Sequence, residues 1–210
     1  HLRLLTSLLD DADRWLAPRE AALLRAQPGP FLLGGTAPDV RTISPITREA
    51  THFYPIPPDP DRPSMQTLLR AWPGLAEPWA LLPEQAAFVA GDLAHLWFDE
   101  FWYATIVDPY YVSCTSWGTH RSRFDVFNVL MGHLDRQDKA ELDGNLGALL
   151  QHTTPNGWLP FVAEADLLAW RDFLAGQLIP GAETRTVEIM ARRAHMEPAD
   201  FAALTGDPQR

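Results

Sequence analysis

The sequence has little that would brace the fold covalently or attract a polyanion. It contains one cysteine, Cys114, which excludes an internal disulfide framework. Lysine and arginine together number 17 against 27 aspartates and glutamates, giving a formal net charge of −10. Binding to a nucleic-acid backbone depends on neutralising phosphates, and no basic patch is visible. We therefore expect no nucleic acid as a stable partner.

Several organising patterns are also missing. The sequence shows no repeat of about 20–50 residues, no low-complexity tract and no alternation of strands with helices. No secretion signal precedes the first helical pattern, so we expect a cytoplasmic protein and leave secretion open. Because the sequence starts with His1 rather than Met, we expect further residues before it in the full protein. The oligomeric state stays open.

Helical periodicity is what the sequence does have. Apolar residues recur at helical spacing over most of the chain, and 210 residues suffice for one domain with its own core. We predict an all-α fold, a single domain over residues 1–210, packed around a central buried helix at about 85–107. Residues 40–63 and 108–120 are predicted as loops. Later helices are predicted near 119–134, 139–151, 163–176, 182–194 and 197–204.

The predicted central helix carries a polar stripe. Residues 85–107 are almost all apolar or aromatic, yet Asp92, His95 and Asp99 interrupt them at steps of three and four. That spacing places the three side chains on one helix face, which argues against a membrane span. Burying carboxylates without partners is costly, so the stripe calls for compensation. A metal ion shared by His95 and Asp99 would supply it, and a salt bridge on a solvated face is the alternative.

Other candidate ligands lie outside this helix. Asp39 follows Gly-Gly-Thr-Ala-Pro, and His52 lies in Thr-His-Phe-Tyr. By itself Asp39 is typical of a cap or turn, and His52 of an ordinary loop histidine, although both residue types bind metals. His1 opens the first predicted helix, and a tag remnant is its alternative interpretation.

Four charged residues near these candidates have supporting interpretations. Arg41 and Arg48 flank the segment from Asp39 to His52. They are interpreted either as a phosphate clamp or as partners of the carboxylates and surface residues. Asp92 is predicted to accept a hydrogen bond that orients an imidazole. Glu100 is predicted to lie at the surface or behind the ligands.

In their order along the chain, these residues resemble the zinc-dependent phospholipase C family, which is related to the S1/P1-type nucleases. The resemblance covers about the first half of the chain. It implies an all-helical fold with a cleft that holds up to three zinc ions, and hydrolysis of phosphodiesters in phospholipids or single-stranded nucleic acid. The matching segments are HLRLL with His1, FLLGGTAPDV with Asp39, THFY with His52, and GDLAHLWFDEFW with His95 and Asp99.

The resemblance also implies a ligand set. Asp39, His52, His95 and Asp99 would form one metal site, and His1 would hold a second ion with Asp99 bridging. Two histidines and two aspartates suit zinc, although carboxylate-rich sites also admit manganese or iron. We therefore predict a zinc cofactor of one or two ions.

The chain departs from the family at the third metal. The family has a further histidine about ten residues after the first helix ligand, and then a His-x-x-x-Glu pair. Here residues 104–107 read ATIV, and Phe124 stands four residues after His120. His120 is kept as a candidate ligand or acid–base group, with a backbone-bonded helix-start histidine as the alternative.

The leading hypothesis is a metal-dependent hydrolase of a small-molecule or lipid phosphoester, acting through metal-activated water. Asp39 and His120 are the predicted catalytic residues. One alternative is a non-catalytic helical metalloprotein whose site is structural or degenerate. Another is a metal-dependent hydrolase with a different substrate.

Overall fold

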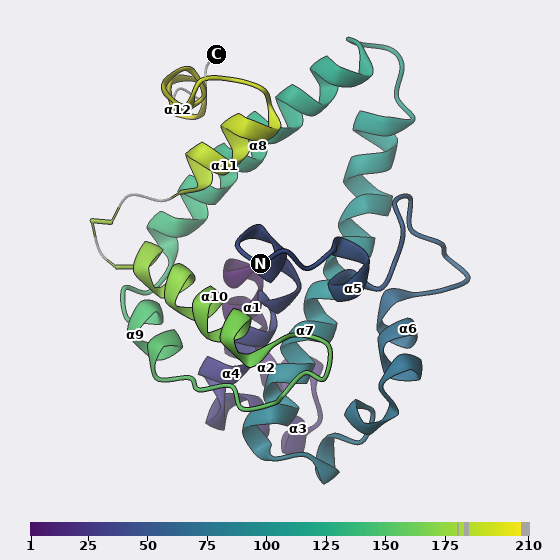
Figure 1. The fold of residues 1–210 in the computed structure, drawn as a ribbon, viewed down its shortest axis with the longest axis vertical. Coiled ribbons are helices and arrows are strands. Elements are labelled where there is room, and N and C mark those ends of the chain that lie inside the picture. The colour runs from purple at the N-terminus through teal and green to yellow at the C-terminus, as the bar shows by residue number, and fades with distance from the viewer. Residues whose placement is uncertain (180, 183–184, 207–210) are drawn as a thin grey trace. The chain divides into compact units, whose positions relative to one another are not determined.

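The computed structural model describes residues 1–179, 181–182 and 185–206 (Figure 1). Within these ranges every regular element is a helix, so the prediction of an all-α fold is confirmed. No helix in the described ranges is both long enough and apolar enough to cross a membrane.

The contacts of the chain gather in two compact units. The first comprises residues 1–101 and 145–176, and the second comprises residues 102–144 and 177–210, of which 180, 183–184 and 207–210 lie outside the described residues. The predicted single domain over residues 1–210 stays a prediction.

The first unit holds most of the helices, and each follows a local sequence signal. Pro18, Pro28 and Pro83 each begin a helix, where a missing backbone N–H costs nothing. Thr47 caps the short helix that carries His52, because its hydroxyl oxygen accepts the Ala50 N–H. The elements of this unit are α1 (Leu2–Asp10), α2 (Ala12–Trp15), α3 (Pro18–Ala26), α4 (Pro28–Gly34), η1 (Ala37–Thr42), α5 (Arg48–His52), α6 (Ser64–Ala71), η2 (Pro73–Leu75), η3 (Pro78–Ala80), α7 (Pro83–Trp102), α9 (Leu146–Gln151) and α10 (Glu164–Gln177).

Helices α4 and α7 contact each other backbone to backbone. A Cβ atom at Gly34 would lie 1.9 Å from the carbonyl oxygen of Phe88, and one at Gly91 would lie 2.0 Å from that of Phe31. Both glycines are therefore required by the close approach. The approach brings the end of α4, at Gly35, against the middle of α7, where the polar stripe lies.

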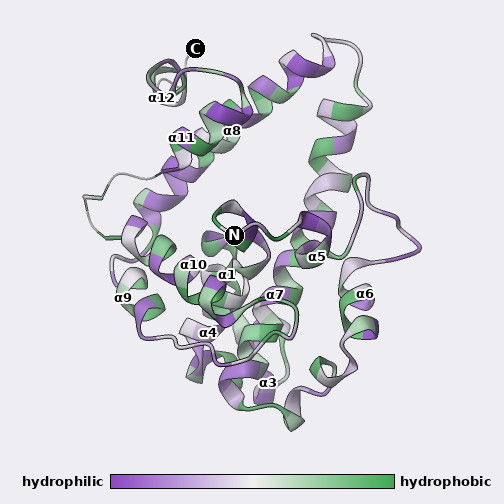
Figure 2. Cartoon of the chain, viewed as in Figure 1, coloured by the Kyte–Doolittle hydropathy of each residue, from purple (hydrophilic) through white to green (hydrophobic). Residues whose placement is uncertain are grey.

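Helix α7 is apolar on its buried face except at the stripe. Phe88 and Leu96 are fully buried, and so are Asp92 and His95. In Figure 2 hydrophilic residues interrupt the hydrophobic colouring of α7. The predicted helix at 85–107 thus forms, but its α-helical part is Pro83–Trp102.

Two predicted loops contain helices. The segment predicted as a loop at 40–63 includes the end of η1 and all of α5, because Thr47 supplies a cap that the Pro- and Thr-rich composition obscures. The segment predicted as a loop at 108–120 begins inside a π-helical stretch, η4 (Tyr103–Val112), which continues directly from α7. Both loop predictions were wrong over those residues.

The second unit contains η4, α8 (His120–Glu141), α11 (Thr186–Arg193) and α12 (Pro198–Gly206). Phe201, Ala191 and Ala194 form its buried core. Arg123 is 5% exposed and donates to the carbonyl oxygens of Tyr111 and Gly118, at 2.8 and 3.1 Å. These bonds tie the end of η4 to the start of α8.

Later boundaries differ modestly from the predictions. The helix predicted at 119–134 extends to Glu141 as α8, and the one predicted at 139–151 shortens to Leu146–Gln151 as α9. The predicted helix at 182–194 is observed as Thr186–Arg193, and its residues 183–184 lie outside the described part.

Candidate metal centre

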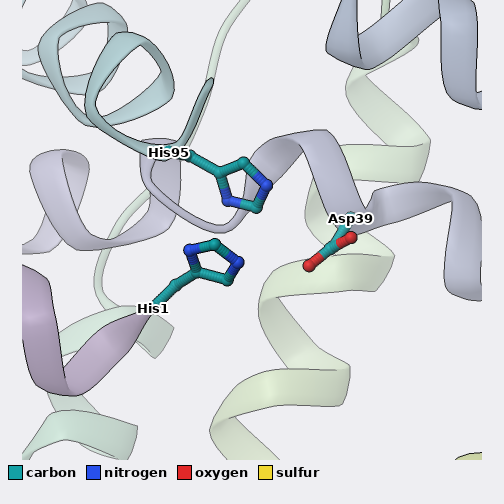
Figure 3. A group of neighbouring side chains, drawn as sticks. All are labelled: His1, Asp39 and His95. Carbon is teal, nitrogen blue, oxygen red and sulfur yellow. The ribbon is translucent and has the colours of Figure 1, made fainter. Parts of the chain in front are cut away.

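Five predicted ligands gather in the first unit, from four separate elements. His1 is the residue before α1, Asp39 lies in η1, His52 ends α5, and His95 and Asp99 lie on α7. Two overlapping groups have all their ligand atoms within 4.8 Å of one another: His1 with Asp39 and His95, and His52 with His95 and Asp99. Figure 3 shows the first group, in which the Asp39 carboxylate points toward the two imidazoles.

The distances from Asp99 and Asp39 to the two buried histidines approach those of a metal site. The Oδ2 atom of Asp99 lies 3.6 Å from His52 Nε2 and 3.8 Å from His95 Nε2. The Oδ1 atom of Asp39 lies 3.8 Å from His52 Nε2. Zinc with ligands at about 2.0–2.1 Å in tetrahedral geometry places ligand atoms about 3.3–3.4 Å apart. These three separations exceed that spacing by about 0.2–0.5 Å, and the ligand nitrogens of His52 and His95 lie within 4.8 Å of each other.

The tautomer of His95 follows from its backbone partner. Its Nδ1 atom lies 2.9 Å from the carbonyl oxygen of Gly35, which can only accept a hydrogen bond. The Nδ1 atom therefore carries the proton, and Nε2 presents its lone pair to the cluster. That Nε2 atom is buried and has no hydrogen-bond partner among the described residues. A buried polar atom without a partner needs an explanation, and a metal ion would supply one.

The His52 ring has the same tautomer as that of His95, with the proton on Nδ1. Its Nδ1 atom lies 2.9 Å from the hydroxyl oxygen of Thr51, whose own proton is donated to the carbonyl oxygen of Arg48. The Thr51 oxygen must then accept from Nδ1, which leaves the His52 Nε2 lone pair facing Asp39 and Asp99.

Burial favours the uncharged form of both imidazoles. It lowers the pKa of His52, and the charges of Arg48 and Arg41 lower it further while Asp39 and Asp99 raise it. Burial likewise lowers the pKa of His95, against the raising effect of the two carboxylates. Metals bind the neutral imidazole, so this electrostatic environment favours ligation.

His1 lies at the open side of the cluster. Its ring stacks on that of His95, with centroids 3.8 Å apart and an interplanar angle of 17°. Its Nε2 atom lies 3.5 Å from the other oxygen of Asp99, Oδ1, and its side chain is 23% exposed. Asp99 therefore faces His1 with one oxygen and His52 and His95 with the other.

Two further residues, Tyr54 and Arg48, donate hydrogen bonds to the Asp99 carboxylate. Tyr54 donates its hydroxyl proton to Asp99 Oδ2 at 3.2 Å, and Arg48 donates from Nη2 to the same oxygen at 3.4 Å. Arg48 thus agrees with its interpretation as a carboxylate partner, while Arg41 is exposed. Tyr54 was not predicted; its place two residues after His52 was the available signal.

Glu100 contacts α6, whereas Asp92 is buried without a hydrogen-bond partner among the described residues. Glu100 accepts from the backbone N–H and the hydroxyl of Ser64, at 3.0 and 2.9 Å, and so caps α6. The prediction that Asp92 orients an imidazole was wrong, because Gly35 already occupies the Nδ1 atom of His95. Asp92 is fully buried, and neither of its oxygens has a hydrogen-bond partner among the described residues.

His120 belongs to the second unit. It is exposed at the first position of α8, where its ring packs on that of Phe124 with centroids 4.7 Å apart. Its catalytic role stays a prediction.

Comparisons with protein-family models, with curated proteins and with solved structures find no match for this chain. The resemblance to the zinc-dependent phospholipase C family therefore stays a hypothesis carried by the residues of the cluster alone.

Proposed function

We propose that this protein is a metal-dependent hydrolase of phosphoester bonds, with zinc as its metal and a small-molecule or lipid phosphoester as its substrate. The observation that carries the proposal is the Nε2 atom of His95, buried, deprotonated and unpartnered beside Asp99 and His52.

The residues fit a divalent cation in charge and in donor type. The carboxylates of Asp39 and Asp99 would attract a divalent ion, and the two imidazoles would each offer a nitrogen lone pair. Two nitrogens and two oxygens form a donor set that zinc accepts. His95 has a single free nitrogen, so it would bind one ion, together with Asp39, His52 and Asp99. His1 and Asp99 Oδ1 lie where a second ion would bind.

Each residue would have a distinct task during hydrolysis. A bound divalent ion would make water more acidic and stabilise negative charge on the phosphoryl oxygens. The buried imidazoles of His52 and His95 would hold their positions because their Nδ1 protons are already engaged. The Asp39 side chain is 37% exposed and reaches both solvent and the cluster, so it would accept the proton of the attacking water.

Metal analysis combined with a substrate panel tests this proposal. We expect the purified protein to bind zinc and to hydrolyse phosphodiesters faster than phosphomonoesters or carboxylic esters. Asp39→Asn should weaken metal binding and lose most of the hydrolysis, whereas His95→Ala should lose both metal and hydrolysis. Absence of metal binding in the wild type would overturn the proposal, and turnover of carboxylic esters alone would reassign the substrate.

A non-catalytic role is the second candidate, and one observation favours it. The ligands come from the start of α1, from η1, from α5 and from α7, so an ion would cross-link four elements of one unit. In that case chelation would lower the melting temperature while no phosphoester or carboxylic ester was turned over.

A further inference from the structure

Arg48 and Tyr54 form a closely packed pair. The guanidinium carbon of Arg48 lies 4.3 Å from the centroid of the Tyr54 ring, which is a cation–π contact. Arg48 also donates from Nη1 to the Tyr54 carbonyl oxygen at 3.4 Å and from Nη2 to the Tyr54 hydroxyl. Tyr54 is 4% exposed. The pair is therefore held rigidly, with several contacts between two residues of one short segment.

The pair converges on one oxygen of Asp99. Both the Tyr54 hydroxyl and the Arg48 Nη2 atom donate to Oδ2, and this same oxygen faces the Nε2 atoms of His52 and His95. No such donor from the pair reaches Oδ1, which faces His1. The two oxygens of Asp99 are thus distinguished by their partners.

The Tyr54 hydroxyl is well suited to fix the orientation of the Asp99 carboxylate. It donates to Asp99 Oδ2 at 3.2 Å and accepts from Arg48 Nη2, so both its proton and its oxygen are engaged. A fixed donor limits rotation of a carboxylate that is otherwise partly exposed, and a ligand held in place loses less entropy when it binds a metal.

We propose that Arg48 and Tyr54 are positioning residues that hold Asp99 Oδ2 between His52 and His95 and thereby set the metal affinity and coordination geometry of the centre. This inference rests on the proposed function, because it requires that the cluster bind a metal.

A purely electrostatic role for Arg48 predicts the opposite effect. A positive charge beside the cluster would repel a divalent cation, so its removal would tighten metal binding. Arg41 supplies a matched control, because its charge also acts on His52 while it is exposed in η1. Positioning therefore predicts weaker binding for Arg48 and Tyr54 variants, and unchanged or tighter binding for Arg41→Ala.

The test compares wild type, Tyr54→Phe, Arg48→Lys and Arg41→Ala by competition for zinc with a chromogenic chelator, and by the visible spectrum of the cobalt-substituted proteins. Tyr54→Phe keeps the ring that packs on Arg48 and removes only the donor. Arg48→Lys keeps the charge and removes the planar fork, so a purely electrostatic role predicts unchanged binding for this variant. We expect both to weaken zinc binding about 10–100-fold and to change the cobalt spectrum. Thermal melting of the metal-free proteins shows whether Tyr54→Phe or Arg48→Lys fails to fold. If one of them does, the zinc affinity of the other tests the positioning role.

The outcomes separate this inference from the proposed function. If the wild type binds zinc and both variants bind it as tightly with unchanged cobalt spectra, the positioning role is wrong while the metal centre stands. Tighter binding by Arg48→Lys or Tyr54→Phe would also overturn it. If the wild type binds neither metal, the proposed function fails and the positioning role fails with it.

Discussion

The carbonyl oxygen of Gly35 accepts the Nδ1 proton of His95 at 2.9 Å, across 60 residues of sequence. This bond joins the end of α4 to the middle of α7 and decides which nitrogen of His95 faces the cluster. It exists because the two helices approach so closely that only glycine fits at Gly34 and Gly91. Helix packing and ligand geometry are therefore linked.

Replacing one of these glycines should disturb both properties. In Gly91→Ala the new methyl group would meet the Phe31 carbonyl oxygen, so we expect the free energy of unfolding to fall by about 1–3 kcal/mol. Zinc affinity should fall as well, because α4 and α7 must separate. Gly176→Ala in α10 is the matched control, since nothing lies within 4 Å of its added methyl group. Chemical denaturation and metal titration measure the two effects; equal behaviour of both variants would contradict the link.

Removing the metal should lower stability only while the cluster is intact. A ligand that binds the folded state alone stabilises it by mass action, by about 2.7 kcal/mol at a hundredfold excess over Kd. We expect chelation to lower the melting temperature of the wild type and to leave that of His95→Ala unchanged. Thermal melting with and without chelator tests this. A His152→Ala control should respond like the wild type, because the exposed His152 belongs to neither ligand group.

The metal-free protein should lose stability in mild acid. Burial lowers the pKa of His52 and His95 in the folded state, whereas in the unfolded chain both titrate near about 6.5. Below that pH the unfolded chain binds more protons, so the free energy of unfolding falls as pH drops toward the folded values. The slope is at most about 1.4 kcal/mol per pH unit for each histidine. Denaturation between pH 7 and 5 measures it, and His52→Asn should show a shallower dependence.

Asp92 should destabilise the protein at neutral pH. Its burial raises the pKa well above the usual value, so the folded state favours the neutral carboxyl while the unfolded chain ionises above about 3.9. Stability from this group is present in acid and is lost as pH rises. Asp92→Asn removes the titration, so we expect it to be more stable than the wild type at pH 7, with the difference shrinking toward pH 4. Lower stability of the variant at pH 7 would show that the carboxylate has a stabilising role.

Much of the fold could be predicted because helical periodicity is a local property. The apolar pattern of residues 85–107 located the buried helix, although its α-helical part begins at Pro83 and ends at Trp102. The predicted helix boundaries were wrong where a single residue decides where a helix begins or ends. Thr47 caps α5 inside a segment predicted as a loop. The change from α-helical to π-helical backbone after Trp102 has no sequence signal that we recognised.

The sequence by itself determined the all-helical class and the residue types available to a metal. The step of four residues places His95 and Asp99 on one face of α7 whatever surrounds them, because helix geometry is local. Only the tertiary structure decided that Asp39 and His52 meet that face, that Gly35 and Thr51 set the imidazole tautomers, and that Tyr54 and Arg48 hold one oxygen of Asp99. These depend on the close packing of α4 against α7 and on contacts between distant segments, which no local pattern encodes.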